Sequence, residues 1–293
     1  MKDGPMRDAF SIRFRVPQPA LAPHVTSFYL LDCAADGVDD WLHPEWANIR
    51  FAIEGNWAWA AAGERGPPQW LADATLFGPM AKAARIIGTP GARVIGVGLT
   101  PRGWAQLVGE PAIRFANGAV PLAGLFPETA ELLLRLRAAA DDDTRVDRLG
   151  DWLTARLSDP KPCDPHVDRL HRALVSGNVS TVPAFADEVC VSERTLERLC
   201  PKLFGFAPKK LLRRQRFLRT LDKMQRNPGR TFTDSLDGHY TDQSHFVREF
   251  KAHMGMSPSA YFGLARPLMQ AAGRARAEML GETMQGLHAP QHG

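Results

Sequence analysis

A short stretch near the C-terminus, DQSHFVREFKAHMGMSP (residues 242–258), combines polar side chains with an apolar stripe. Phe246 and Phe250 are four residues apart, which places them on one face of a helix and leaves the polar side chains on the other faces. Asp242 can accept a hydrogen bond from the first turn, and Gly255 suits a helix C-terminus. The pattern predicts a short capped helix that packs by one face and presents hydrogen-bonding groups at its start.

Basic residues are concentrated in the same half of the chain. Residues 1–160 carry 16 basic and 19 acidic side chains, whereas residues 161–293 carry 20 basic and 13 acidic ones. Between Arg194 and Arg230 there are 12 basic residues and only two acidic ones, Glu197 and Asp222. This excess favours a polyanionic partner, and a solvated basic surface is the plainer interpretation of charge alone.

Residues suited to catalysis or metal binding are few. The segment LHPEW holds His43 and Glu45, which would suit a cupin-like metal-dependent enzyme. That function needs further ligands, and His24 is the only other histidine before residue 166. Asp237 and His239 would form a weak metal pair without a third ligand nearby. No nucleophile has the spacing of a hydrolase motif, so we expect no catalytic residues, metal or cofactor.

Length and composition indicate a globular protein of two domains. The chain has 293 residues, of which 44% are apolar, and no stretch of 18 uninterrupted apolar residues suggests a membrane span. The N-terminus lacks the apolar core of a signal peptide, and the four cysteines form no CxxC pair. We therefore expect a cytoplasmic protein without a membrane partner.

The residue patterns predict an α+β protein. Alternating runs such as FSIRFRV indicate short strands in an antiparallel barrel or sandwich, and later segments have helical periodicity. The predicted divisions are a β-rich sensor or assembly domain (1–127), an antiparallel helix pair (128–157), a linker (158–165), a helical domain (166–263) and a tail (264–293).

The predicted helix pair is unusually apolar. Either it forms a dimer contact, giving a homodimer, or it packs onto the β-domain. The residues concerned are Leu132, Leu133, Leu136, Val146, Leu149, Trp152 and Leu153.

Five tryptophans lie within 30 residues of the predicted β-domain. They could line an apolar ligand pocket or fill the core of a small barrel. The candidate pocket residues are His43, Trp46, Trp57 and Trp59.

The helical region contains one shape twice. TVPAFADEVCVSERTLERLCPKLFGFAP and TFTDSLDGHYTDQSHFVREFKAHMGMSP each predict a helix, a tight turn and a second helix, and each ends in Gly-x-x-Pro. The intervening segment predicts one continuous helix about 27 Å long. Residues 166–263 resemble the double helix-turn-helix DNA-binding domain of AraC/XylS-type transcriptional regulators, a bacterial family.

The resemblance implies sequence-specific binding of double-stranded DNA, with one chain placing two recognition helices in successive major grooves. Arginine suits guanine, glutamate suits cytosine and glutamine suits adenine. The implied base-reading residues are Arg194, Glu197, Arg198, Gln243, Ser244, Val247 and Arg248. The expected phosphate contacts are Thr195, Lys202, Lys209, Lys210, Arg213 and Lys251.

Three residues depart from the family pattern. Ser235 and His239 stand where the family has a small apolar residue and a glycine, and Pro201 is expected to bend the first recognition helix or end it early. An interaction protein that has lost DNA binding is therefore a further alternative. The resemblance also makes RNA polymerase and a small-molecule effector candidate partners, and it does not distinguish an activator from a repressor.

Overall fold

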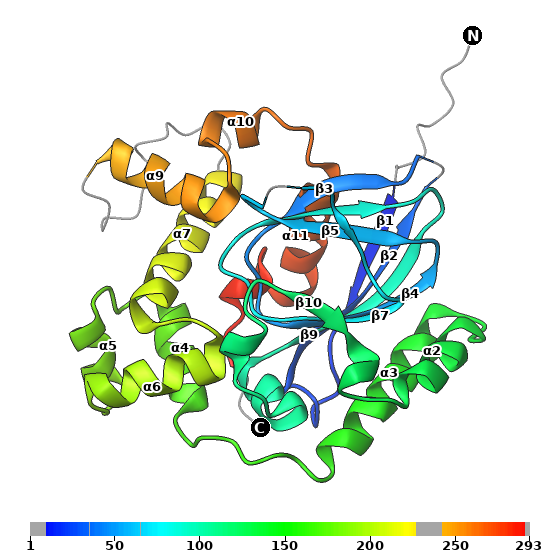
Figure 1. The fold of residues 1–293 in the computed structure, drawn as a ribbon, viewed down its shortest axis with the longest axis horizontal. Helices are drawn as coiled ribbons and strands as arrows, with labels where there is room; N and C mark the ends of the chain where they lie inside the picture. Colours follow the sequence, from blue (N-terminus) through cyan, green and yellow to red (C-terminus); the bar gives the residue numbers. More distant parts are fainter. Residues whose placement is uncertain (1–9, 35, 65, 227–241, 291–293) are drawn as a thin grey trace.

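The computed structural model describes residues 10–290 except 35, 65 and 227–241. Its first half contains two antiparallel sheets that face each other (Figure 1). In spatial order, the six-stranded sheet consists of β1 (Phe10–Arg15), β2 (Val25–Cys33), β9 (Arg93–Leu99), β4 (Asn48–Glu54), β7 (Ala74–Phe77) and β10 (Ala119–Pro121). The four-stranded sheet consists of β3 (Val38–Leu42), β8 (Ala84–Gly88), β5 (Trp57–Ala61) and β6 (Gln69–Trp70). The predicted β-rich architecture is therefore a sandwich.

Both faces of the larger sheet are buried, which explains the long apolar runs in its central strands. Neighbouring residues of a strand point to opposite faces. Leu30 belongs to a core shared with the helix pair, whereas Leu31 belongs to the core between the two sheets. Ile95 and Val94 of β9 divide in the same way.

The helix pair consists of α2 (Thr129–Arg137) and α3 (Asp142–Leu157). Asp141 caps α3 by accepting a hydrogen bond from the amide of Thr144 at 2.7 Å. The leucines that suggested a dimer contact are buried against the larger sheet, with Leu136, Leu149 and Leu153 each 0% exposed. Packing onto the β-domain therefore uses the apolar surface on which the dimer prediction rested.

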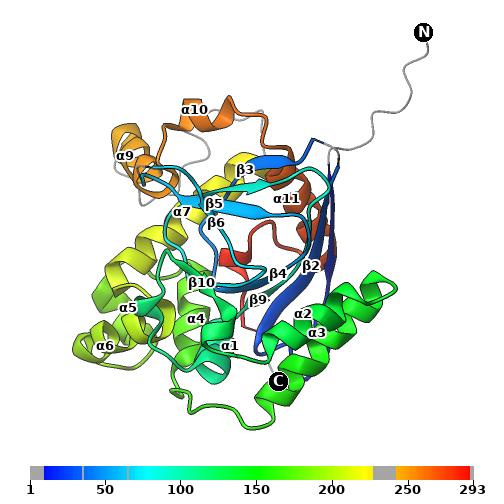
Figure 2. The same ribbon diagram turned by 45° about the vertical axis from the view of Figure 1, so that its right-hand side comes forward.

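The helical domain begins with α4 (Val167–Ser176) and α5 (Val182–Glu188) and continues through α6 (Glu193–Phe204) and α7 (Pro208–Arg226). After the undescribed segment come α9 (Gln243–Met254) and α10 (Pro258–Phe262). In both views α6 and α9 lie at opposite ends of α7 and on the same side of the molecule (Figures 1 and 2). The single helix predicted between the two motifs is confirmed, at 19 residues.

The segment expected to be a tail contains a further helix, α11 (Pro267–Leu280), followed by the short turn η4 (Gln285–Leu287). α11 does not extend the helical domain. It packs against β1 and β3, in the orange-red region beside the strands (Figure 2). The chain thus returns to its first domain after completing its second. No helix among the described residues is long and apolar enough to cross a membrane.

Candidate functional site

The first candidate recognition helix, α6, is fixed by a local cap and an apolar stripe. Ser192 accepts a hydrogen bond from the amide of Thr195 at 3.2 Å, as its position before the helix predicts. The helix continues through Pro201 to Phe204, so the expectation that it ends early at the proline is wrong. Gly205, at φ +82°, then ends it by donating to the carbonyl of Pro201. The inward residues are Leu196, Leu199 and Leu203, and the exposed ones include Arg194, Glu197 and Arg198.

The second candidate recognition helix, α9, has the same construction. Asp242 accepts a hydrogen bond from the amide of His245 at 2.6 Å, and Gly255 ends the helix at φ +73°. Phe246 and Phe250 are both 0% exposed, so the predicted packing face is confirmed. The predicted reading residues Gln243, Ser244 and Arg248 are exposed, and Val247 is half-buried. Both helices therefore present polar side chains that no core contact requires.

The predicted phosphate contacts occupy different environments. Lys202, Lys209, Lys210 and Lys251 are exposed, whereas Thr195 is half-buried beside its cap. Lys210 lies with its ammonium 4.5 Å from the centre of the Phe206 ring.

Arg213, the remaining predicted phosphate contact, is engaged within the protein. Its Nε donates to the carboxylate of Glu249 at 2.8 Å, and Arg216 donates to the same carboxylate at 2.8 Å. Glu249 lies within α9 and its side chain is 0% exposed. Two cations of α7 thus hold a buried anion of α9, and this pairing fixes α9 relative to α7. Sequence reasoning missed Glu249, because an acidic residue in a basic region gives no sign of its burial.

The helical domain also contacts the loop between β7 and β8. His253 of α9 donates from Nδ1 to the carbonyl of Ala81 at 2.6 Å. Arg214 of α7 is 0% exposed and donates from Nε to the carbonyl of Met80 at 2.7 Å. Burial lowers the pKa of Arg214 to about 9. One loop of the β-domain therefore holds two helices of the candidate DNA reader.

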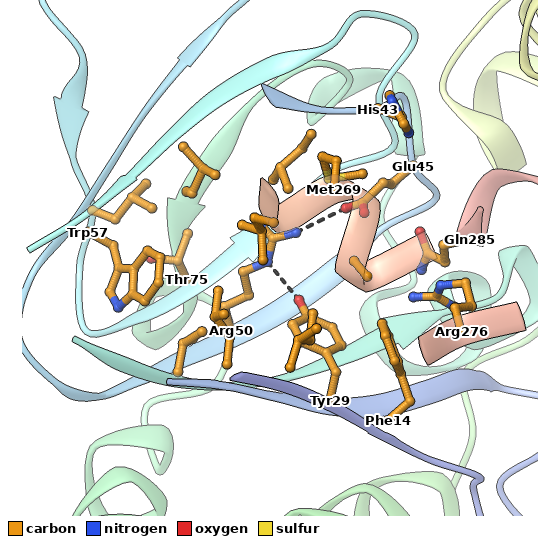
Figure 3. Close-up of a pocket in the computed structure, with 18 of the residues that line it drawn as sticks. Phe14, Tyr29, His43, Glu45, Arg50, Trp57, Thr75, Met269, Arg276 and Gln285 are labelled. Carbon is orange, nitrogen blue, oxygen red and sulfur yellow. Dashed lines mark hydrogen bonds and ion pairs between the residues drawn. The ribbon is translucent and has the colours of Figure 1, made fainter. Parts of the chain in front are cut away.

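A cavity lies between the two sheets and the C-terminal segment (Figure 3). Of the four predicted pocket residues, His43 and Trp57 line it and the other two do not. Trp46 instead packs under the guanidinium of Arg214, at 4.1 Å, and Trp59 lies edge-on to Phe77. The apolar lining includes Ile12, Leu31, Ile86, Val94, Leu268 and Met269.

Charged side chains in the cavity come from both ends of the chain. Arg50 of β4 forms an ion pair with Glu45 at 2.9 Å and donates to the hydroxyl of Tyr29 at 2.7 Å (Figure 3). Tyr29 reaches Arg50 across Gly96, where an added Cβ would lie 2.2 Å from the tyrosine ring. Arg276 enters from α11 and is 7% exposed. Sequence reasoning missed both arginines, because only the folded chain brings β4 and α11 together.

Metal binding at the LHPEW segment finds no support in the described residues. They contain no group of three or more histidine, cysteine, aspartate or glutamate side chains placed to hold a metal ion. His43 is fully buried, which lowers its pKa to about 3, and its Nε2 lies 2.5 Å from the hydroxyl of Tyr261. Asp237, Ser235 and His239 lie outside the described residues.

Comparison with known proteins assigns the helical half. Residues 185–263 match the family model described as "Helix-turn-helix domain". This match covers both candidate recognition helices. The chain carries a helix-turn-helix domain of the AraC type, and it is a DNA-binding transcriptional regulator. No curated protein matches the sequence.

Similarities to solved structures are weak. ToxT from Vibrio cholerae has 10% identity and a TM-score of 0.43, with 88% of this chain and 99% of that chain covered. The AraC-like transcriptional activator CuxR has 12% identity and a TM-score of 0.29, covering 72% and 86%. KdgF from Halomonas sp. has 14% identity and a TM-score of 0.25, covering 34% and 83%. Likeness at this level carries no inference about a ligand or a mechanism.

Proposed function

We propose that one chain of this regulator reads two successive major grooves, with α6 in one groove and α9 in the next. The arrangement of these helices at the two ends of α7 carries the proposal. With 19 residues, α7 is about 28 Å long at 1.5 Å per residue. Successive major grooves on one face of DNA are about 34 Å apart. The helix and the turns at its ends match that spacing.

The exposed polar residues then take distinct roles. On α6, Arg194 and Arg198 suit guanine and Glu197 suits cytosine. On α9, Gln243 suits adenine and Arg248 suits guanine. Ser244 is a further base-reading residue of α9, and Val247 offers an apolar contact to a thymine methyl. The exposed lysines supply phosphate contacts that add affinity without selectivity. They are Lys202, Lys209, Lys210 and Lys251.

The engaged Arg213 is a different case. Its hydrogen bond to Glu249 indicates that Arg213 helps to position α9 relative to α7. A phosphate contact by the same guanidinium would have to share its donors with that carboxylate. We therefore assign Arg213 to the alignment of the two helices, in place of the simple phosphate contact that its charge suggested.

We further propose that the cavity of the β-domain is the site of a small-molecule effector. It combines apolar walls with a few convergent polar groups, which is the usual character of a ligand site. His43 supports a link to DNA reading, because it lines the cavity and contacts the helical domain through Tyr261.

A regulator that reads DNA is expected to act in the cytoplasm, with RNA polymerase as a candidate partner. A homodimer through α2 and α3 stays a prediction, and Leu134, 65% exposed, is the large apolar side chain that this pair still presents.

Selection of bound fragments from random DNA tests the proposed reading mode. The full chain should enrich two short elements about 10 base pairs apart, without a need for palindromic symmetry. Arg274→Ala offers a matched control for the arginine variants of α6 and α9, because Arg274 is exposed on α11, away from both recognition helices. Recovery of no enriched sequence would favour the alternative of an interaction protein that has lost DNA binding.

A further inference from the structure

Arg276 is a buried cation that has no ion pair within the described part of the chain. Its side chain lies over the ring of Phe14, with 4.4 Å from the guanidinium carbon to the ring centre. Nη1 donates to the hydroxyl of Ser27 at 3.3 Å. Among the residues that the structure describes, no carboxylate forms an ion pair with it. A guanidinium that is 7% exposed therefore has only a long hydrogen bond and an aromatic contact.

Neither of the two carboxylates nearest to Arg276 in electrostatic effect forms an ion pair with it. Glu45 is the acidic group that most favours the charged form of Arg276, but its ion pair at 2.9 Å is with Arg50. Glu282 lies 3.3 Å from His288, without a hydrogen bond between the two side chains. A buried charge is costly unless it is paired and hydrogen-bonded. The cost at Arg276 points to an anion that completes this site when bound.

The remainder of the cavity defines the body of that anion. Most of its lining residues are aliphatic or aromatic, and α11 contributes Leu268, Met269 and Ala272. The cavity volume is about 80 Å³. One water needs roughly 10–15 Å³ of such space, so the cavity has room for roughly five to eight non-hydrogen atoms. A short aliphatic chain fits this volume and these mostly apolar walls.

We propose that the cavity receives a short aliphatic monocarboxylate, whose carboxylate is bound by Arg276 and whose chain packs between the sheets. Guanidinium and carboxylate match as two parallel charge-assisted hydrogen bonds. The inference rests on the proposal that this cavity is the effector site, and it assigns the recognition of the ligand to a helix that follows the DNA-binding domain.

Arg276 belongs to the C-terminal segment, which also contacts the DNA-binding domain. The same C-terminal segment contributes Gln285, which accepts a hydrogen bond from Asn48 of β4 at 3.3 Å. The carbonyl of the adjacent Gly286 accepts from Gln215 of α7 at 2.9 Å. A carboxylate on Arg276 would stabilise α11 against the strands. It would thereby favour the docked segment that also holds α7.

Calorimetric titration of the full-length protein tests the proposal with defined probes. Butyrate, hexanoate and octanoate vary the chain length, the matching primary amides remove the charge, and inorganic phosphate supplies an anion without an apolar body. Butyrate and hexanoate should bind, octanoate should bind more weakly because it exceeds the cavity, and amides and phosphate should not bind. Arg276→Met should lower hexanoate affinity by at least about tenfold, the value of a charge-assisted hydrogen bond.

Two further variants separate recognition from folding. Arg276→Lys keeps the charge and should retain part of the affinity, whereas Arg274→Met removes an exposed arginine of the same helix and should bind hexanoate as the unmodified chain does. Equal binding of acids and amides, unchanged hexanoate affinity in Arg276→Met, or no binding of any acid would overturn the proposal. Specific DNA binding by ligand-free protein, measured in parallel, would show that the proposed reading function stands even then.

Discussion

Nε2 of His43 lies 2.5 Å from the hydroxyl of Tyr261, which joins the cavity wall of the β-domain to the DNA-binding domain. Burial lowers the pKa of His43 to about 3 and raises that of Tyr261 to about 12, so both partners are neutral near pH 7. The Tyr261 ring lies 5.6 Å from that of Phe250 in α9, centre to centre. Two contacts therefore connect the cavity wall to the second recognition helix.

Removal of the Tyr261 hydroxyl should destabilise the protein. Tyr261→Phe keeps the ring against Phe250 but leaves a nitrogen of the buried His43 without its partner, so we expect a loss of about 1–3 kcal/mol. Denaturant unfolding of the full chain provides the measurement.

A double-mutant cycle with His43→Leu gives the control for this contact. Once the histidine is absent, Tyr261→Phe should cost much less, because no unpaired ring nitrogen remains. Equal costs of Tyr261→Phe in both backgrounds would show that the hydrogen bond contributes nothing.

The buried carboxylate of α9 should be essential for the alignment of the two recognition helices. Glu249→Gln leaves the guanidinium groups of Arg213 and Arg216 facing a neutral amide. We expect a loss of about 3–5 kcal/mol in unfolding free energy, the usual result of removing one partner of a buried ion pair. Glu110→Gln is a useful comparison, since Glu110 pairs with Arg114 at 2.5 Å, both side chains are exposed, and the change should cost less than about 1 kcal/mol. A Glu249→Gln protein as stable as the unmodified chain would contradict the role assigned to this carboxylate.

Stability should fall with acidification through the buried histidines. Burial lowers the pKa values of His43 and His171 to about 3 and that of His253 to about 4, whereas an unfolded histidine has a pKa near 6.5. Below about pH 6.5 the unfolded chain therefore binds more protons than the folded chain, and stability is lost as pH falls towards 4. Each histidine should contribute about 1 kcal/mol per pH unit in this window.

Denaturant unfolding at pH 7, 6 and 5 checks this expectation. His253→Gln, which can still donate to the carbonyl of Ala81, should reduce the dependence on pH, since it removes one of the histidines whose pKa burial lowers. An unfolding free energy that stays constant from pH 7 to 5 would show that these histidines are not held neutral.

Local features of the recognition helices could be predicted from sequence because their causes are local. Ser192 and Asp242 cap through hydrogen bonds to residues three positions later, and Phe246 and Phe250 follow the helical period. The family resemblance rests on the same segments, which is why the class of protein was accessible before the fold.

Features that depend on distant parts of the chain could not be predicted in this way. The apolar surplus of α2 and α3 indicated a need for cover, but it did not show that strands of the same chain supply it. Burial of Glu249 depends on two arginines of another helix. Arg276 contacts Ser27, 249 positions earlier, so the local sequence around either residue does not predict the contact.

Base-reading and phosphate-binding residues should differ in what their loss changes. Arg248→Ala should cost about 1–3 kcal/mol of binding and relax selectivity at one element only. Lys251→Ala, three residues later and also exposed, should weaken all sequences alike and reduce the salt dependence of log K by about one unit. Binding to a set of single-base variants of the selected site distinguishes the two. Unchanged base preference in Arg248→Ala would remove this residue from the reading set.

The central claim is that one chain covers two adjacent major grooves, and a footprint at single-nucleotide resolution tests it most directly. The full-length protein is bound to its selected site, to the same site with 5 base pairs inserted between the two elements, and to each element alone. The account predicts two protected segments about 10 base pairs apart on one face of the DNA, with simultaneous protection lost when the insertion turns one element to the opposite face. Protection of one groove per chain, or equal protection of both elements with the insertion present, would contradict it.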